Sequence, residues 1–170
     1  MKTAIKIFSL AIAIIGFSAT SFAQVSATAT ATSTIVTPIA ISKTVDMNFG
    51  NVAVSSSAGT VVLATAGTRS ATGGVTLPAT SGTIAAAEFN VTGQAGYTYS
   101  ITLPSTATTV TSGSNNMTVN AFTSNPVDGT AVLTGGAQTV KVGATLNVGA
   151  SQAAGTYTSA TPFTVTVNYN

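Results

Sequence analysis

The sequence lacks cysteine, histidine and tryptophan, and it holds only five basic and three acidic residues among 170. Without cysteine there is no disulfide, no thiolate nucleophile and no thiolate ligand for a soft metal. Without histidine there is no imidazole base and no imidazole ligand. These absences exclude most of the side-chain chemistry on which enzymes depend, and they leave the hydrophobic core as the source of stability.

The first 23 residues have the layout of a secretory signal peptide. Lys2 and Lys6 precede an apolar run at residues 7–17, and the small residues Ser21 and Ala23 stand where a signal peptidase reads the chain. A retained anchor helix is the alternative, but this run of eleven residues is shorter than the roughly 20 apolar residues that a membrane-spanning helix needs. A lipid anchor at the cleavage site would need a cysteine, and the chain has none, so a lipoprotein is excluded. We expect cleavage near Ala23 and secretion to the periplasm, the outer surface or the extracellular space.

The rest of the chain is electrically neutral. Three basic residues stand against three acidic ones: Lys43, Arg69, Lys141, Asp46, Glu88 and Asp128. Nucleic acids and anionic membranes need clustered basic residues, so neither is expected as a partner, and no membrane-spanning helix is expected after cleavage. A neutral surface with few charges favours association at high concentration.

The dominant pattern is an alternation of apolar and polar residues with period two. At residues 163–169, Phe, Val, Val and Tyr alternate with Thr, Thr and Asn, as in a strand with one buried face. The same alternation predicts strands at residues 45–49, 87–91, 97–103, 117–121 and 140–148, with shorter ones at 61–63, 75–77 and 131–133. Turns are predicted at Gly73-Gly74, residues 93–96, residues 112–116, Asn125-Pro126, Asp128-Gly129 and Gly135-Gly136.

These strands predict an all-β fold. The 33 threonines favour a pleated, half-buried surface over a helix. Nine to ten short strands separated by turns indicate one antiparallel two-sheet sandwich at residues 37–170, of immunoglobulin-like or jelly-roll character. A small outer-membrane β-barrel is the alternative, but such barrels carry aromatic girdles and longer strands, and only eight aromatic residues follow Ala23.

Residues 24–36 form a separate threonine- and alanine-rich segment. From Val25 to Ile35 every second residue is serine or threonine, and the residues between them are mostly small and apolar. Three interpretations remain open. The segment is the first strand of its own sandwich, ending near Pro38, which cannot donate to a ladder; or it is an extension that completes the sheet of a second copy; or it is a loosely ordered linker.

Three stretches of the sequence resemble a bacterial secreted family known as domain of unknown function 4402. They are residues 37–52, 89–104 and 140–169, and they include Asn48-Phe49-Gly50, Thr92-Gly93 and Gly155-Thr156-Tyr157. The resemblance implies an envelope or surface protein of Gram-negative bacteria, and it brings no activity with it. The closing Gly-Thr-Tyr and alternating strand are also similar to fimbrial and spore-coat-U-like subunits, although the disulfide of many such subunits has no counterpart here.

No catalytic, cofactor-binding or metal site is predicted. Glycosidases use a pair of carboxylates, whereas Asp46 and Glu88 occupy polar positions of strands and Asp128 begins an Asp-Gly turn. Neither Lys43 nor Lys141 has a catalytic motif around it. Tyr97 and Tyr99 are expected on one face, as core residues in preference to a sugar-stacking platform.

The sequence therefore predicts a protein that is not an enzyme and has no cofactor. The leading hypothesis is a secreted structural or adhesive component of the bacterial cell surface that polymerises by strand addition through its N-terminal strand. One alternative is a monomeric module that binds carbohydrate or matrix, with a surface protein or a glycan as partner through Tyr97, Tyr99, Tyr157 or Phe122. The other alternative is the small membrane barrel.

Overall fold

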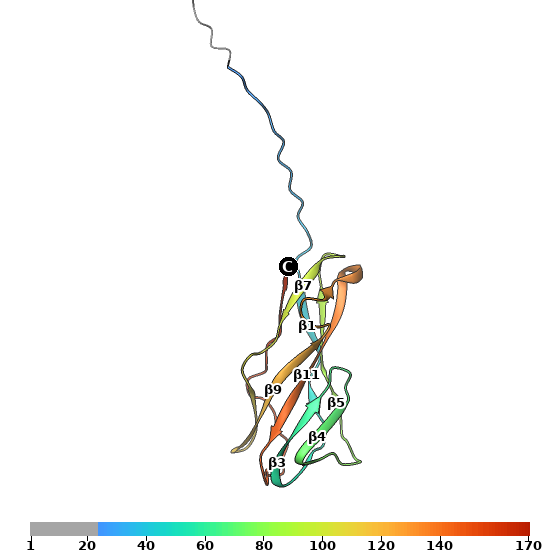
Figure 1. Ribbon diagram of the computed structural model, residues 1–170, viewed down its shortest axis with the longest axis vertical. Helices are drawn as coiled ribbons and strands as arrows, with labels where there is room; N and C mark the ends of the chain where they lie inside the picture. The colour runs from blue at the N-terminus through green and yellow to red at the C-terminus, as the bar shows by residue number, and fades with distance from the viewer. Residues whose placement is uncertain (1–23) are drawn as a thin grey trace, which may run out of the picture. The chain divides into compact units, whose positions relative to one another are not determined.

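The computed structural model describes residues 24–170, and the predicted signal peptide lies outside the described residues. The chain divides into two units at Ile35, and the strands of the described residues all lie in the second unit, Ile35–Asn170. The fold of this unit is all-β and antiparallel, as predicted, with twelve strands, slightly more than expected (Figure 1). The strands are β1 (Ala40–Val45), β2 (Asn48–Phe49), β3 (Ala53–Leu63), β4 (Arg69–Thr76), β5 (Ile84–Ala85), β6 (Ala87–Thr92), β7 (Thr98–Thr102), β8 (Thr108–Ser112), β9 (Asn115–Asn125), β10 (Ala131–Val132), β11 (Ala137–Val148) and β12 (Thr166–Tyr169).

The strands form one large sheet and two small ones. Seven strands make up the large sheet, in the order β1-β6-β11-β3-β4 with β9 and β8 attached through β11. A three-stranded sheet has the order β10-β7-β12, and β2 pairs with β5 in a third sheet. This arrangement is sandwich-like, because side chains from the large sheet and the three-stranded sheet share one hydrophobic cluster.

Strand β11 organises the large sheet. It pairs with β6 through residues 137–142, with β3 through residues 144–148, and with β9 through residues 141–147. Since the residues facing β9 overlap both other sets, β6 and β3 lie end to end along one edge of β11 and β9 occupies the other edge. In Figure 1, β9 and β11 run obliquely along the long axis of the folded unit, and β3 lies in its lower part.

The core follows the predicted alternation. On β11 the buried side chains are those of Val140, Val142, Ala144, Leu146 and Val148. The first two belong to a cluster with β6 and the three-stranded sheet, and the last three to a cluster with β3, β4 and β9. Met47 and Phe122 pack against both clusters. The two halves of the core are therefore continuous along one face of β11.

The predicted strand at residues 45–49 was wrong, because the chain changes sheets in the middle of it. Strand β1 ends at Val45 after a register shift against β6, and Asn48 and Phe49 pair instead with β5. The alternation persists because Met47 and Phe49 still pack on the core. Burial sets the alternation of side chains, but it does not set which strand is the neighbour.

The predicted hairpin turn at Gly73-Gly74 was also wrong, since both glycines lie inside β4. They lie opposite an irregularity in β3, where the register shifts between Val54 and Gly59. A Cβ atom on either glycine would collide with carbonyl oxygens of residues 57 and 58. The glycines therefore permit a close approach of two backbones at a bulge. The turn joining β3 to β4 is at residues 64–68.

A matched pair of valines tests the core. Val140 is fully buried and Val127 is 64% exposed. We expect Val140→Ala to lower the free energy of unfolding by about 2 kcal/mol, because it removes buried methyl groups and leaves a cavity. Val127→Ala should change it by less than about 0.5 kcal/mol. Urea unfolding of both variants measures the difference, and equal losses would contradict this assignment of the core.

Candidate functional site

The charged side chains of the described residues are engaged in structural contacts. Lys43 forms an exposed ion pair with Asp46 at 2.5 Å. Lys141 and Glu88 lie directly opposite each other on β11 and β6, with Nζ 2.7 Å from Oε1. No group of three or more acidic or other metal-ligating side chains occurs within residues 24–170. Asp46 and Glu88 thus each have a cationic neighbour that explains their positions, and Asp128 accepts a backbone N–H.

Arg69 binds backbone carbonyl groups. Its Nη1 donates to the carbonyl oxygen of Phe49 and, at 2.7 Å, to that of Asn51, and its Nη2 donates to that of Ser81 at 3.4 Å. Gly50, between the first two, has a φ of +68° that favours glycine. The guanidinium thereby fixes the bend after β2 against β4, and its donors are directed at the main chain.

A slot opens where the ladder between β7 and β12 stops. Their register places Thr166 opposite Thr102, so Thr164 would lie opposite Pro104. Hydrogen-bonded pairs alternate along an antiparallel ladder, and the 98–170 pair is one of them, since the Asn170 N–H donates to the Thr98 carbonyl at 3.4 Å. The next such pair after 166 would need an N–H from Pro104, which has none.

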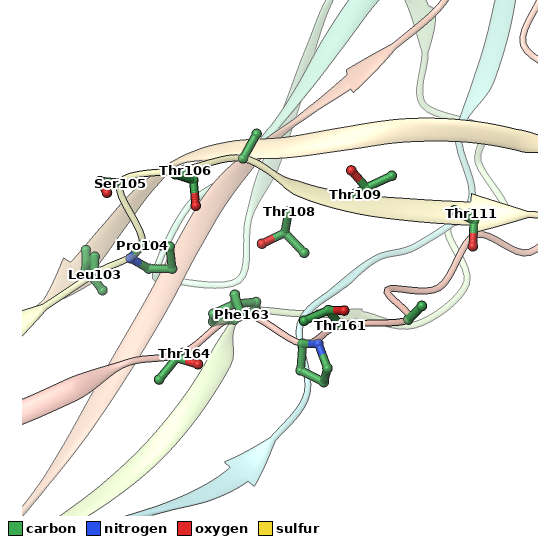
Figure 2. Close-up of a pocket in the computed structure, with 13 residues that line it drawn as sticks. Leu103, Pro104, Ser105, Thr106, Thr108, Thr109, Thr111, Thr161, Phe163 and Thr164 are labelled. Carbon is green, nitrogen blue, oxygen red and sulfur yellow. The ribbon is translucent and has the colours of Figure 1, made fainter.

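The two segments separate at this point and meet again at Thr111 and Thr158. There the N–H of each residue donates to the carbonyl of the other, at 2.9 and 3.0 Å. Between the two contacts lies a pocket of about 590 Å³. Figure 2 shows it between the segment that carries Pro104 and Thr108 and the segment that carries Phe163.

The lining of the slot is hydroxylated and uncharged. Among its 13 residues seven carry a hydroxyl group, and none is charged: Ser105, Thr106, Thr108, Thr109, Thr111, Thr161 and Thr164 supply the hydroxyls. Phe163 contributes the aromatic surface, and its ring packs against those of Phe122 and Phe89 with centroids 4.9 and 6.4 Å away. Such a surface suits a neutral, hydrogen-bonding ligand, and no charged side chain lies among the lining residues beside these hydroxyl groups.

The sequence did not predict this slot. Residues 163–169 were expected to form one strand, and only Thr166–Tyr169 do so. The reason lies in the partner strand, because Pro104 ends the ladder from the other side. The proline after the alternation of β7 was the available signal.

The outer edge of β12 is the second candidate feature. Since residues 166, 168 and 170 face β7, the N–H and C=O groups of Val167 and Tyr169 point away from it. The N–H of Ile101, which lies opposite Val167, likewise points away from β12 and donates to Oδ1 of Asp128. Within residues 24–170 the only ladder of β12 is the one with β7. One edge of the three-stranded sheet is therefore open.

The N-terminal segment, residues 25–35, forms no strand, so the interpretation as the first strand of its own sandwich was wrong. Its side chains are exposed, including those of Val25 at 93% and Ile35 at 95%. Two residues further on, the Thr37 carbonyl accepts a hydrogen bond from the Tyr169 hydroxyl at 2.7 Å, and that hydroxyl accepts one from the Gln94 N–H at 2.6 Å. Tyr169 thus fixes Thr37 beside the end of β12.

The aromatic residues considered for sugar binding are not equivalent. Tyr97 precedes β7, is 44% exposed and packs edge-on against Tyr169, whereas Tyr99 is fully buried and donates to Gln138 at 2.7 Å. Burial raises the pKa of Tyr99. Tyr157 and Phe122 are half-buried. The expectation that Tyr97 and Tyr99 both belong to the core holds for Tyr99 alone.

Asp128 offers a direct test of a structural carboxylate. Its Oδ1 accepts the N–H of Ile101 at 2.7 Å, in place of a ladder partner. Asp128→Ala should lower the free energy of unfolding by about 1–3 kcal/mol, because a part-buried N–H loses its acceptor. Asp128→Asn retains an acceptor oxygen and should lose less than half as much. Urea unfolding compares the two, and equal losses would show that the hydrogen bond is not the cause.

Comparison with known proteins identifies one family. The family model described as domain of unknown function (DUF4402) matches residues 39–169. No curated protein and no solved structure matches the chain. Among the described residues, no helix is long and apolar enough to cross a membrane.

Proposed function

For a chain that belongs to the DUF4402 family, we propose a function as a non-enzymatic structural or adhesive component of the bacterial cell surface that polymerises by strand addition. The observation that carries this proposal is the combination of residues 25–35 with an open sheet edge. The segment alternates like a strand but is unpaired and exposed. Backbone groups at a sheet edge bind an added strand, and alternate side chains of that strand give specificity.

The chemistry of the folded unit supports a non-enzymatic role. Its acidic and basic side chains are engaged with one another or with the main chain. The slot beside Pro104 holds hydroxyl groups without a charged neighbour that would activate them. Secretion is supported by the sequence alone, through the signal-peptide layout of residues 1–23.

The symmetry of such an assembly would favour filaments. The donor segment and the acceptor edge are different surfaces of one chain, so each copy would use one surface as donor and the other as acceptor. Contacts of this head-to-tail kind form rings when the rotation closes and open filaments when it does not.

Microscopy and electrophoresis test the proposal. Electron microscopy of cells that produce the intact chain should show filaments or a coat that a deletion strain lacks. On native gels the purified chain should form ladders, and a variant without residues 24–35 should run as a monomer, because the donor strand is gone. A strictly periplasmic monomer would contradict the structural role. Oligomers that survive the deletion would contradict assembly through this segment.

A second candidate function is the binding of a neutral saccharide, and the slot beside Pro104 favours it. Hydroxyl groups can bond to sugar hydroxyls, and Phe163 can pack against a sugar ring.

Removal of two hydroxyl groups from the slot tests this candidate. The double variant Thr108→Val and Thr161→Val should weaken binding to neutral glycans on an array at least tenfold, at roughly 1 kcal/mol per lost hydrogen bond. Thr139→Val, exposed on β11 outside the slot, is the control and should bind as before. Absence of glycan binding by the unaltered chain would refute this candidate without affecting the first.

A further inference from the structure

Residues 25–35 have the properties of a donor strand. They contain no proline and no charged residue, so every backbone group is free to join a ladder. Fully extended, eleven residues span roughly 36–40 Å, more than the whole of β12. One side of the extended segment would carry Ala27, Ala29 and Ala31, and the other side Thr28, Thr30 and Thr32.

Several edges of the sheets are free to accept a strand, and they differ in how well they are protected. Natural proteins protect edges with charges, bulges, proline and very short strands. β1 carries the ion-paired Lys43. β4 carries Arg69 and lies opposite a bulge. β8 is already bridged to Thr158. β10 has two residues.

The outer edge of β12, a strand of four residues, has no charge, no bulge, no proline and no bridge to another segment within residues 24–170. The strand is uncharged, and Val167 and Tyr169 present backbone N–H and C=O groups that no ladder uses within residues 24–170. Residues 163–165 continue the alternation and lie outside any ladder. The acceptor edge, residues 163–169, is therefore about as long as the central part of the donor.

The core at this margin is incompletely covered. Ile39, just before β1, and Ile41, within it, pack against the hydrophobic cluster that contains Val165 and Val167. Both isoleucines remain half-buried, as do Phe163 and Tyr169. β1 and β12 are the end strands of their sheets, and they approach within 8 Å between Cα atoms. Stacked sheets normally lie about 10 Å apart, so the closer approach here favours small side chains at this margin. Alanine at alternate positions of the donor meets that requirement.

We propose that residues 25–35 of one copy bind as an added strand to the outer edge of β12 in a second copy. The alanine side of the donor faces the core margin beside Ile41, and the threonine side faces solvent with Thr166 and Asn168. The inference rests on the proposed assembly by strand addition, and it specifies the acceptor. Tyr169 donates to the carbonyl of Thr37 in its own chain, two residues after the donor segment ends in the sequence.

A charge placed on either side of the donor tests its sidedness. In Ala29→Asp the carboxylate would be buried against the core margin, and the assembled fraction in sedimentation should fall at least tenfold. Thr30→Asp places the same charge on the solvent side and should assemble within twofold of the unaltered chain. Both positions are exposed in a free segment, so an equal response of the two variants would overturn the proposal.

Disulfide trapping identifies the acceptor, and the absence of cysteine from the chain removes any background. Copies carrying Thr28→Cys, Thr30→Cys or Thr32→Cys are mixed with copies carrying Asn168→Cys and then oxidised. At least one pair should form an intermolecular disulfide, because side chains on the same face of neighbouring strands lie about 5 Å apart. Ala29→Cys, on the other side of the donor, should not form one.

The same cysteines distinguish the other outcomes. Acceptor copies carrying Ser42→Cys on β1 or Thr109→Cys on β8 present the competing edges, and both residues are exposed. Trapping at either of these positions and not at Asn168, in assemblies that still form, would overturn the β12 acceptor and leave the proposed function standing. Failure of the unaltered chain to assemble at any concentration would overturn both.

Discussion

The large sheet depends on β11 having a partner along both of its edges. Three ladders converge on this strand, with β6 and β3 sharing one edge and β9 occupying the other. All five of its inward side chains are buried, and they join the two hydrophobic clusters into one core. Gly143 lies among them because the backbone of residues 63–65 packs where its side chain would be. Without β11 the remaining strands of the large sheet would form only the isolated pairs β1–β6, β3–β4 and β8–β9, and isolated pairs are marginally stable in water.

The surface around this core is polar through hydroxyl groups and not through charge. The described residues contain three basic and three acidic side chains, and two pairs of these neutralise one another. Charged side chains on edge strands are a common protection against association, and most edges of this molecule rely instead on bulges, bridges and short strands. The edge of β12, although only four residues long, has no bulge and no bridge within the described residues, and in this it differs from the other edges.

The local sequence predicted sidedness well and strand partners poorly. Strands appear at residues 87–91 and 140–148 as predicted, and the one predicted at 97–103 appears as Thr98–Thr102, because burial of one face makes every second residue apolar. At residues 45–49 and 163–165 the alternation is real but the ladder is absent or different, because the partner is set by distant residues such as Pro104. Glycines 73 and 74 were misread for a related reason, since a bulge and a turn use the same residue type. The absence of a reactive cluster followed from composition, whereas the slot beside Pro104 required knowledge of which strands are neighbours.

The connectivity of the ladders has a consequence for the order of folding. Only β3–β4 and β8–β9 pair strands that follow one another in the chain; the other ladders join strands separated by at least one further strand. Local hairpins form in microseconds, whereas distant pairings must first overcome the entropy of closing long loops. The two hairpins are thus the earliest structures available to the chain, and β11, which lies after both, is the strand that joins them. A folding chain would consequently have both hairpins available before the central strand is in place, and their surface would be polar through threonine and serine rather than through charge.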